Sequence, residues 1–244
     1  MTLPRVIGHR GAAAVAPENT LAGLRRAKAL GASWVELDVR LTRDQCPVLM
    51  HDARIDRTTD GAGLLAELAF AELRALDAGA WFGEEFRGEP VPSLAETVAE
   101  LGRLDLGAIF ELKPAPGQSA ATARAVVAVL ARHWPPHLPP PMLSSFDGAA
   151  LAVAHRAAPG LDRALAVGAV PKDWREQVVT LGCAALHADA RALDAATIAA
   201  VAARLPLFAY TVNEPEPARA LTAWGAAAIF TDRPDLIISA IEHT

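Results

Sequence analysis

The sequence has few cysteines and no long apolar run, and each lack excludes a class of protein. Cys46 and Cys183 are the only cysteines among 244 residues, and their spacing matches no zinc or redox motif. The longest stretch without Asp, Glu, Lys or Arg is 133–146, and five prolines interrupt it, so we expect no membrane insertion. Strand-like sequence begins by Val6, which leaves no room for a secretion signal and favours a cytoplasmic protein.

Positive charge is also scarce. The chain carries 23 Lys and Arg against 28 Asp and Glu, a net charge of −5, and has no block of basic residues. Nucleic-acid binding depends on concentrated positive charge, so no nucleic-acid partner is expected. The hydrophobic content of 52% is enough for one large core, and we expect a single domain over residues 1–244, a length typical of α/β barrels.

Short apolar runs alternate with alanine-rich amphipathic stretches along the chain. This repeated strand-then-helix order is typical of a parallel sheet. The apolar runs are 6–11, 34–41, 47–52, 107–114, 141–146, 162–167, 183–188, 206–212 and 226–231. Nine runs are one too many for a closed barrel of eight strands.

The second and third runs account for the excess. Only a few residues separate them, whereas a crossover between parallel strands needs about a dozen or more, so these two runs must form an antiparallel hairpin. If Asp44 and Gln45 form a two-residue turn, the numbers of paired residues add up to 89 and Asp38 faces His51. A longer loop would shift this pairing.

The alternation stops after His51 and resumes with a helix that begins near Ser93. An insertion of this length, here 52–92, directly after a candidate catalytic residue favours a small cap on the site over a free linker. Trp81 and Phe82 within it either cover a ligand or anchor the cap to the barrel, and anchoring is favoured.

Acidic side chains recur at the ends of the early strands. Side chains two positions apart share one face of a strand, so Glu36 and Asp38 project together, as do Glu111 and Lys113. Strand ends that converge would place three carboxylates together, and an all-oxygen site selects a hard cation such as Mg²⁺ over Zn²⁺. The alternative is that Glu36 is an ordinary ion-pair partner of a nearby cation.

Eight short motifs, spread over nearly the whole chain, carry a resemblance to one family. They are HRG (9–11), PENT (17–20), ELDV (36–39), LMHD (49–52), RTTDGAG (57–63), DAGAWF (77–82), ELKP (111–114) and YTVN (210–213). In this set the chain resembles the glycerophosphodiester phosphodiesterases, and most closely their short cytoplasmic bacterial members. The one departure noted is Tyr210, where many members carry Trp, and it affects the pocket wall more than the chemistry.

The resemblance implies a TIM (β/α)8 barrel with the hairpin extension and the capping insertion. It also implies metal-dependent hydrolysis of glycerophosphodiesters to sn-glycerol 3-phosphate and an alcohol. Glu36, Asp38 and Glu111 would hold one divalent cation, with Mg²⁺ expected and Ca²⁺ or Mn²⁺ as alternatives. His9 and His51 would be the general base and the general acid, because histidines titrate near neutral pH. The sequence does not fix which histidine has which role, and His9 as base with His51 as acid is the favoured order. The substrate's own 2-hydroxyl would attack and give a cyclic phosphate.

The same resemblance makes Arg10 and Lys113 phosphate-binding residues, since fixed cations stabilise the charge that develops on the phosphate. For Lys113 an ion pair with a neighbouring acid is a competing interpretation. Glu18 would either bind a glycerol hydroxyl or brace Arg10, and Asn19 or Thr20 would cap the following helix.

Two other functions remain open at this point. One is cleavage of lysophospholipids by a phospholipase D-like enzyme on the same barrel, and the other is an inactive module that binds glycerophosphodiesters. Another metal-dependent barrel enzyme, such as an aldolase, is disfavoured because the later strand ends offer few ligands. His187 ends an apolar run and either faces the substrate or is a rim histidine. The head group, the physiological ion and the oligomeric state are open, and a homo-oligomer is compatible with the sequence.

Overall fold

A computed structural model describes residues 3–242 of the chain, and eight parallel strands form a closed barrel in it. The strands are β1 (Val6–His9), β2 (Trp34–Leu41), β4 (Gly107–Leu112), β5 (Met142–Ser145), β6 (Arg163–Val167), β7 (Ala185–Asp189), β8 (Leu207–Tyr210) and β9 (Ala228–Thr231). They pair in the order β1-β9-β8-β7-β6-β5-β4-β2, and pairing of β1 with β2 closes the ring. The predicted TIM barrel is therefore confirmed.

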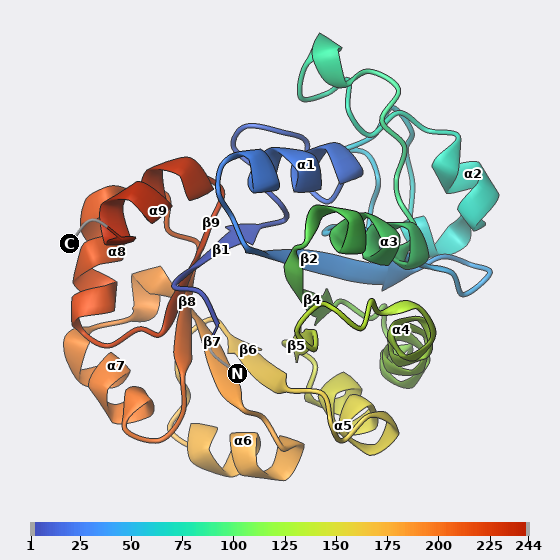
Figure 1. Cartoon of the computed structure of the whole chain (residues 1–244). Coiled ribbons are helices and arrows are strands. Elements are labelled where there is room, and N and C mark those ends of the chain that lie inside the picture. Colours follow the sequence, from blue (N-terminus) through green and yellow to red (C-terminus); the bar gives the residue numbers. More distant parts are fainter. Residues whose placement is uncertain (1–2, 243–244) are drawn as a thin grey trace.

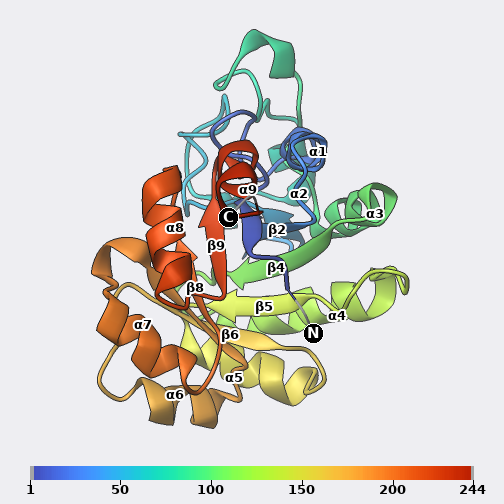
Figure 2. The same cartoon turned by 60° about the vertical axis from the view of Figure 1, so that its left-hand side comes forward.

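Helices surround the barrel in Figures 1 and 2. They are α1 (Leu21–Ala29), α3 (Leu94–Leu104), α4 (Ser119–His133), α5 (Gly148–Ala157), α6 (Trp174–Leu181), α7 (Ala195–Ala202), α8 (Pro215–Ala223) and α9 (Pro234–Glu242). Three of them begin with a side-chain cap: Thr20, Ser93 and Asp147 each accept a backbone N–H with a side-chain oxygen. No helix among residues 3–242 is long and apolar enough to cross a membrane.

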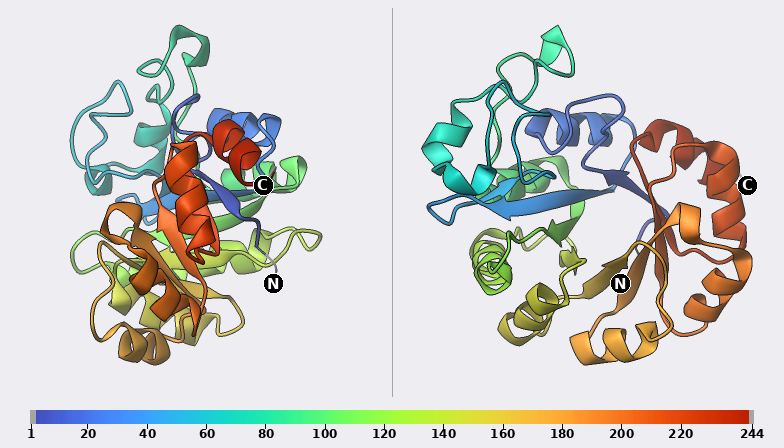
Figure 3. Two further views of the ribbon diagram at one scale, coloured as in Figure 1. Left: turned by 90° about the vertical axis from the view of Figure 1, so that its left-hand side faces the viewer. Right: turned by 180° about the vertical axis from the view of Figure 1, so that it is seen from behind.

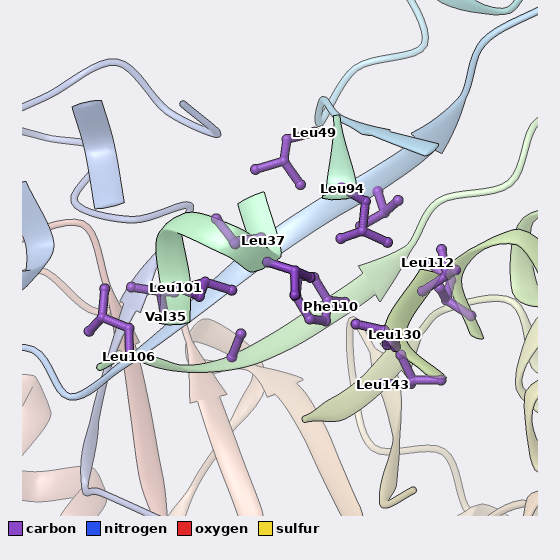
Figure 4. Close-up of a cluster of buried hydrophobic side chains, with 14 of the residues drawn as sticks. Val35, Leu37, Leu49, Leu94, Leu101, Leu106, Phe110, Leu112, Leu130 and Leu143 are labelled. Atoms are coloured by element: carbon purple, nitrogen blue, oxygen red, sulfur yellow. The ribbon is translucent and has the colours of Figure 1, made fainter. Parts of the chain in front are cut away.

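Alternating residues of each strand separate the barrel interior from the layer under the helices. On the outer face Leu37 and Phe110 are fully buried and pack against helix residues such as Leu101, as Figure 4 shows. Burial of one such side chain contributes about 1.5–3 kcal/mol. On the inner face Trp34 fills the barrel below the carboxylates, which therefore lie at its opposite, C-terminal end.

The hairpin extension is present, but its predicted register is wrong by one residue. Strand β3 (Pro47–Leu49) pairs antiparallel with β2, and Val39 lies opposite Leu49, so paired numbers add up to 88. The reason is a three-residue loop, 43–45, closed by the Thr42 N–H donating to the Cys46 carbonyl at 3.1 Å. Gln45 in this loop has a φ of 62°, a left-handed conformation common in three-residue hairpin loops.

The shift changes the neighbour of Asp38. Its backbone carbonyl accepts a hydrogen bond from the Met50 N–H at 3.1 Å, so Asp38 does not face His51 in the ladder. His51 follows one residue later and still reaches the site.

The inserted segment 52–92 projects beyond α1 and α3 in Figures 1 and 3. It contains the short helix α2 (Phe70–Arg74) and two single 3₁₀ turns, Leu65–Glu67 and Glu84–Phe86. The segment has a small apolar core of its own, built around Ile55 and Leu73. The Glu89 carboxylate ties it to the barrel by accepting the Ala22 N–H at 2.9 Å. Its predicted role as a cap stays a prediction.

Trp81 of the insertion is 41% exposed and donates its indole N–H to the Ala78 carbonyl. Its ring packs edge to face on Phe82, which packs in the same way on Phe86. These aromatic rings therefore pack against one another within the insertion.

The packing of Trp34 at the base of the barrel can be tested by a substitution. A Cβ atom added at Gly107 would lie 2.2 Å from Cε2 of Trp34, the residue paired with it across β2 and β4. We therefore expect Gly107→Ala to lower the free energy of unfolding by about 1–3 kcal/mol, the usual cost of overpacking. Gly160→Ala is the control, because no atom lies within 4 Å of its added Cβ. Urea unfolding of both variants measures the difference, and equal stabilities would contradict this account of Trp34.

Candidate active site

A pocket of about 370 Å³ opens at the C-terminal end of the barrel strands. Active sites of TIM barrels lie at this end. Six of the eight predicted site residues line it: His9, Arg10, Glu36, His51, Glu111 and Lys113. The other two, Asp38 and Glu18, contact Arg10 directly, so the structure brings all eight together.

The three carboxylates form a compact buried cluster. Asp38 on β2 pairs with Glu111 on β4, and one oxygen from each of Glu36, Asp38 and Glu111 lies within 4.8 Å of the others. Burial, together with the charges of Asp38 and Glu111, raises the pKa of Glu36 well above its ordinary value. Burial and the charge of Asp38 likewise raise the pKa of Glu111. Burial alone would raise the pKa of Asp38 too, but Lys113 and Arg10 lower it below its usual value.

This cluster fits a divalent cation. The Glu36 Oε1 atom is buried and accepts no hydrogen bond from any residue of the described chain. The raised pKa values and the unpartnered oxygen indicate that the protein alone supplies too little positive charge around these carboxylates. A cation bound between them would supply it. An all-oxygen donor set of this kind suits a hard ion.

Two cations lie beside the carboxylates. The Arg10 guanidinium contacts Glu18 at 2.8 Å and Asp38 at 3.3 Å, and the Lys113 ammonium contacts Glu111 at 2.6 Å and Asp38 at 3.3 Å. The predicted ion pair of Lys113 with a neighbouring acid is therefore present. Both side chains also line the pocket, so each can meet an anionic ligand there.

His9 is held by an acidic partner that directly follows the last strand, β9. Its Nδ1 lies 2.7 Å from Oδ1 of Asp232, and the second oxygen of Asp232 accepts the Asn213 side-chain N–H at 2.7 Å. With Nδ1 occupied, Nε2 is the nitrogen that faces Glu36, at 3.9 Å from its Oε2. The arrangement fixes the orientation of the ring, as carboxylate partners of histidine commonly do.

His51 is held by a different network. Its Nδ1 lies 2.6 Å from Asp52, and Asp52 accepts from Arg57 at 2.7 Å. Arg57 also forks onto both oxygens of Glu18, which in turn binds Arg10. Burial lowers the pKa of His51, and Arg10 and Lys113 add to this, although Asp38 and Asp52 oppose it.

Neighbouring residues of the PENT motif make different contacts. Thr20 is the helix cap and accepts the Gly23 N–H at 3.0 Å. Asn19 instead clamps Asp38, because its amide donates to Oδ2 at 2.8 Å and accepts the Asp38 backbone N–H at 3.1 Å. Glu18 has the bracing contact to Arg10, and its contact to substrate stays a prediction.

Sequence reasoning missed four residues of these networks: Asp52, Arg57, Asn213 and Asp232. A signal was available for two of them. Asp232 directly follows the last apolar run, 226–231, and Asn213 directly follows the run before it, 206–212. Arg57 carries no such signal, because its position next to Glu18 depends on how the insertion folds.

Comparison with known proteins agrees with this geometry. A sequence model described as the glycerophosphoryl diester phosphodiesterase family matches residues 9–236. The glycerophosphodiester phosphodiesterase of Bacillus subtilis is 29% identical over 94% of this chain and 84% of its own. That of Caldanaerobacter subterraneus subsp. tengcongensis is 45% identical over 44% of each chain. The chain spans less than half the length of this relative and of a second bacterial one, at 44% and 46%.

A solved structure is similar over the whole fold. It is a phosphodiesterase from Oleispira antarctica in complex with the product sn-glycerol-3-phosphate, with a TM-score of 0.96 and 41% sequence identity. The match covers 98% of this chain and 97% of that one. With the family match spanning the barrel and the histidines, cations and carboxylates in one pocket, the chain belongs to the glycerophosphoryl diester phosphodiesterase family.

Proposed function

We propose that this protein hydrolyses glycerophosphodiesters to sn-glycerol 3-phosphate and an alcohol, with a divalent cation as cofactor and in the cytoplasm. The observation that carries the proposal is the pocket itself, where two histidines with acidic partners face a carboxylate cluster flanked by two cations. Such a set can bind an anionic diester and move two protons. The names of the relatives point to the same substrate class.

Glu36, Asp38 and Glu111 would hold the cation, and Mg²⁺ is the ion we expect from their hard oxygen donors. When bound, the cation supplies positive charge that polarises the phosphate and offsets the carboxylates. Arg10 and Lys113 bind the phosphate oxygens from the side of the cluster, and Glu18 keeps the Arg10 fork in position. The phosphate thus lies within reach of both histidines.

In the first step the 2-hydroxyl oxygen of the glycerol attacks phosphorus and the bond to the head-group oxygen breaks. His9 takes the proton of the 2-hydroxyl on Nε2, because Asp232 occupies Nδ1. His51, whose Nδ1 is held by Asp52, gives a proton to the departing alkoxide. Water then opens the cyclic phosphate, with a proton lost to His51 and one returned from His9, which restores both histidines.

The first test of this proposal removes the metal. EDTA should abolish release of sn-glycerol 3-phosphate from glycerophosphocholine, and Mg²⁺ or Mn²⁺ should restore it. Glu36→Gln should weaken Mn²⁺ binding by at least about tenfold in titration calorimetry, because one of the charges that hold the ion is lost. Full activity of the metal-free protein would refute the carboxylate site. If the protein released choline from lysophosphatidylcholine but did not cleave glycerophosphocholine, this result would favour the phospholipase D-like alternative.

The second test concerns the proton carriers. His9→Ala and His51→Ala should each lower kcat by about 10²–10⁴-fold, the usual range for a general acid or base. The thermal unfolding midpoint should change little, because the two side chains line the pocket and neither belongs to an apolar core cluster. His133→Ala, at the exposed end of α4, is the matched control and should keep full activity. A histidine whose alanine variant retains normal kcat has no proton-transfer role.

The third test identifies the attacking group. A 2-deoxy glycerophosphodiester should bind as a competitive inhibitor but turn over very slowly, since well-placed internal nucleophiles have effective molarities on the order of 10⁵ M or more. Rapid hydrolysis of this analogue would show that water attacks directly, and the phosphodiesterase assignment would survive that result.

A further inference from the structure

His187 on β7 lines the pocket but belongs to none of the networks described above. His187 is 3% exposed, and its ring faces the barrel interior. The ring stacks on that of Phe208, with the two ring centroids 4.9 Å apart and an angle of 19° between the ring planes. A second ring, Phe230, meets it edge to face at 4.9 Å. These two contacts hold the imidazole in one orientation.

The ring nitrogens of His187 have no hydrogen-bond partner among residues 3–242. Neither forms a hydrogen bond with any residue of the described chain, and Nε2 is fully buried. A buried polar atom without a partner destabilises the fold, whereas phenylalanine at this position would make the same ring contacts without that cost. Packing alone therefore does not explain a histidine here. Because Nε2 is closed off, the nitrogen that a ligand in the pocket can meet is Nδ1.

The ring is neutral at physiological pH. Burial lowers the pKa of His187 to about 3, and no acid pairs with it. In a neutral imidazole Nδ1 carries the N–H donor in one tautomer and is an acceptor in the other, so it can pair with a hydroxyl group in either form. The neighbouring Tyr210 hydroxyl donates to the Val167 carbonyl at 2.7 Å, so its proton is already committed.

The position of His187 relative to the carboxylates selects one hydroxyl. In the ring of eight strands β7 lies opposite β2, the strand of Glu36 and Asp38. A glycerophosphodiester bound with its phosphate beside the carboxylates and its 2-hydroxyl beside His9 directs its remaining carbon, C1, across the pocket. The C1 hydroxyl is the substrate group furthest from the phosphate along the glycerol.

We propose that His187 hydrogen-bonds the C1 hydroxyl of the glycerol and thereby selects diesters with a free, unacylated glycerol end. This inference rests on the proposed function and extends it to substrate selection. A lysophospholipid acylated at C1 lacks the donor hydroxyl, and its chain would have to pass the Phe230 ring, which lines the pocket beside His187. The pocket wall at β7 would then distinguish glycerophosphodiesters from their acylated precursors.

The experiment compares glycerophosphocholine with the phosphocholine ester of propane-1,2-diol, which keeps the 2-hydroxyl nucleophile and lacks only the C1 hydroxyl. The protein should prefer glycerophosphocholine by about 10–100-fold in kcat/KM, because the analogue leaves a buried polar group unpaired. His187→Phe should bring this ratio close to one, mainly by loss of activity on glycerophosphocholine. His187→Asn and His187→Gln place an amide near one ring nitrogen each, and at least one should restore part of the preference.

His133→Phe is the control for a histidine-to-phenylalanine change outside the pocket and should keep the full ratio. Calorimetric binding of sn-glycerol 3-phosphate and of its 1-deoxy analogue gives a readout independent of turnover, and the same ratio should appear there. An unchanged ratio in His187→Phe, or no preference in the unaltered protein, would overturn the inference. Normal discrimination in binding without turnover of either diester would instead refute the proposed function and leave the role of His187 standing.

Discussion

The buried carboxylate cluster is the constraint on which the rest of the site depends. Like charges of Glu36, Asp38 and Glu111 repel one another strongly where water is excluded. The register of β2 and β4 fixes their separation, so the repulsion cannot be relieved by movement of one strand. Positive groups and donors must come to the cluster, and Arg10 and Lys113 do so. A cation bound between the carboxylates would complete the same balance.

The backbone is shaped to deliver these groups. Arg10 has a φ of 50° and Asn19 a φ of 56°, a left-handed conformation that is uncommon outside glycine. At Arg10 this turn lets the backbone N–H reach Glu36 Oε2 at 3.3 Å while the guanidinium reaches Asp38. At Asn19 it places a two-point amide clamp on Asp38. Each strained residue costs on the order of 1–3 kcal/mol, which persists because the surrounding contacts hold it.

The two histidines differ because their partners differ. Asp232 binds His9 while Asn213 holds its other oxygen, so that carboxylate is directed at one ring. Asp52 is shared between His51 and the cation Arg57, which takes part of its negative charge. Burial and the charges of Arg10 and Lys113 lower the pKa of His51. Each imidazole is thus oriented by its own network, one at the end of the barrel strands and one in the insertion.

Much of the architecture was predictable because it follows from the spacing of apolar and charged residues along short segments of the sequence. Nine apolar runs gave the barrel and its hairpin, and period-two spacing placed the acidic pairs on the inner face. The hairpin register was not predictable, because it depends on Gln45 adopting a left-handed conformation. The Asp232 partner of His9 was missed because it lies 223 positions away, and only closure of β9 on β1 joins them.

The two halves of the chain build different parts of the pocket. Charged groups come from residues 9–113, whereas β5 to β9 supply mainly rings and small side chains, with Asp189 already paired to Arg191. Phe146 and Tyr210 pack edge to face, and the Lys113 ammonium lies 5.7 Å from the Phe146 ring centre. Asp232 and Asn213, just beyond β9 and β8, hold His9, and the other residues at the later strand ends mainly shape the pocket wall. In that wall an unpaired imidazole is the exception, and a hydroxyl-bearing substrate gives it a partner.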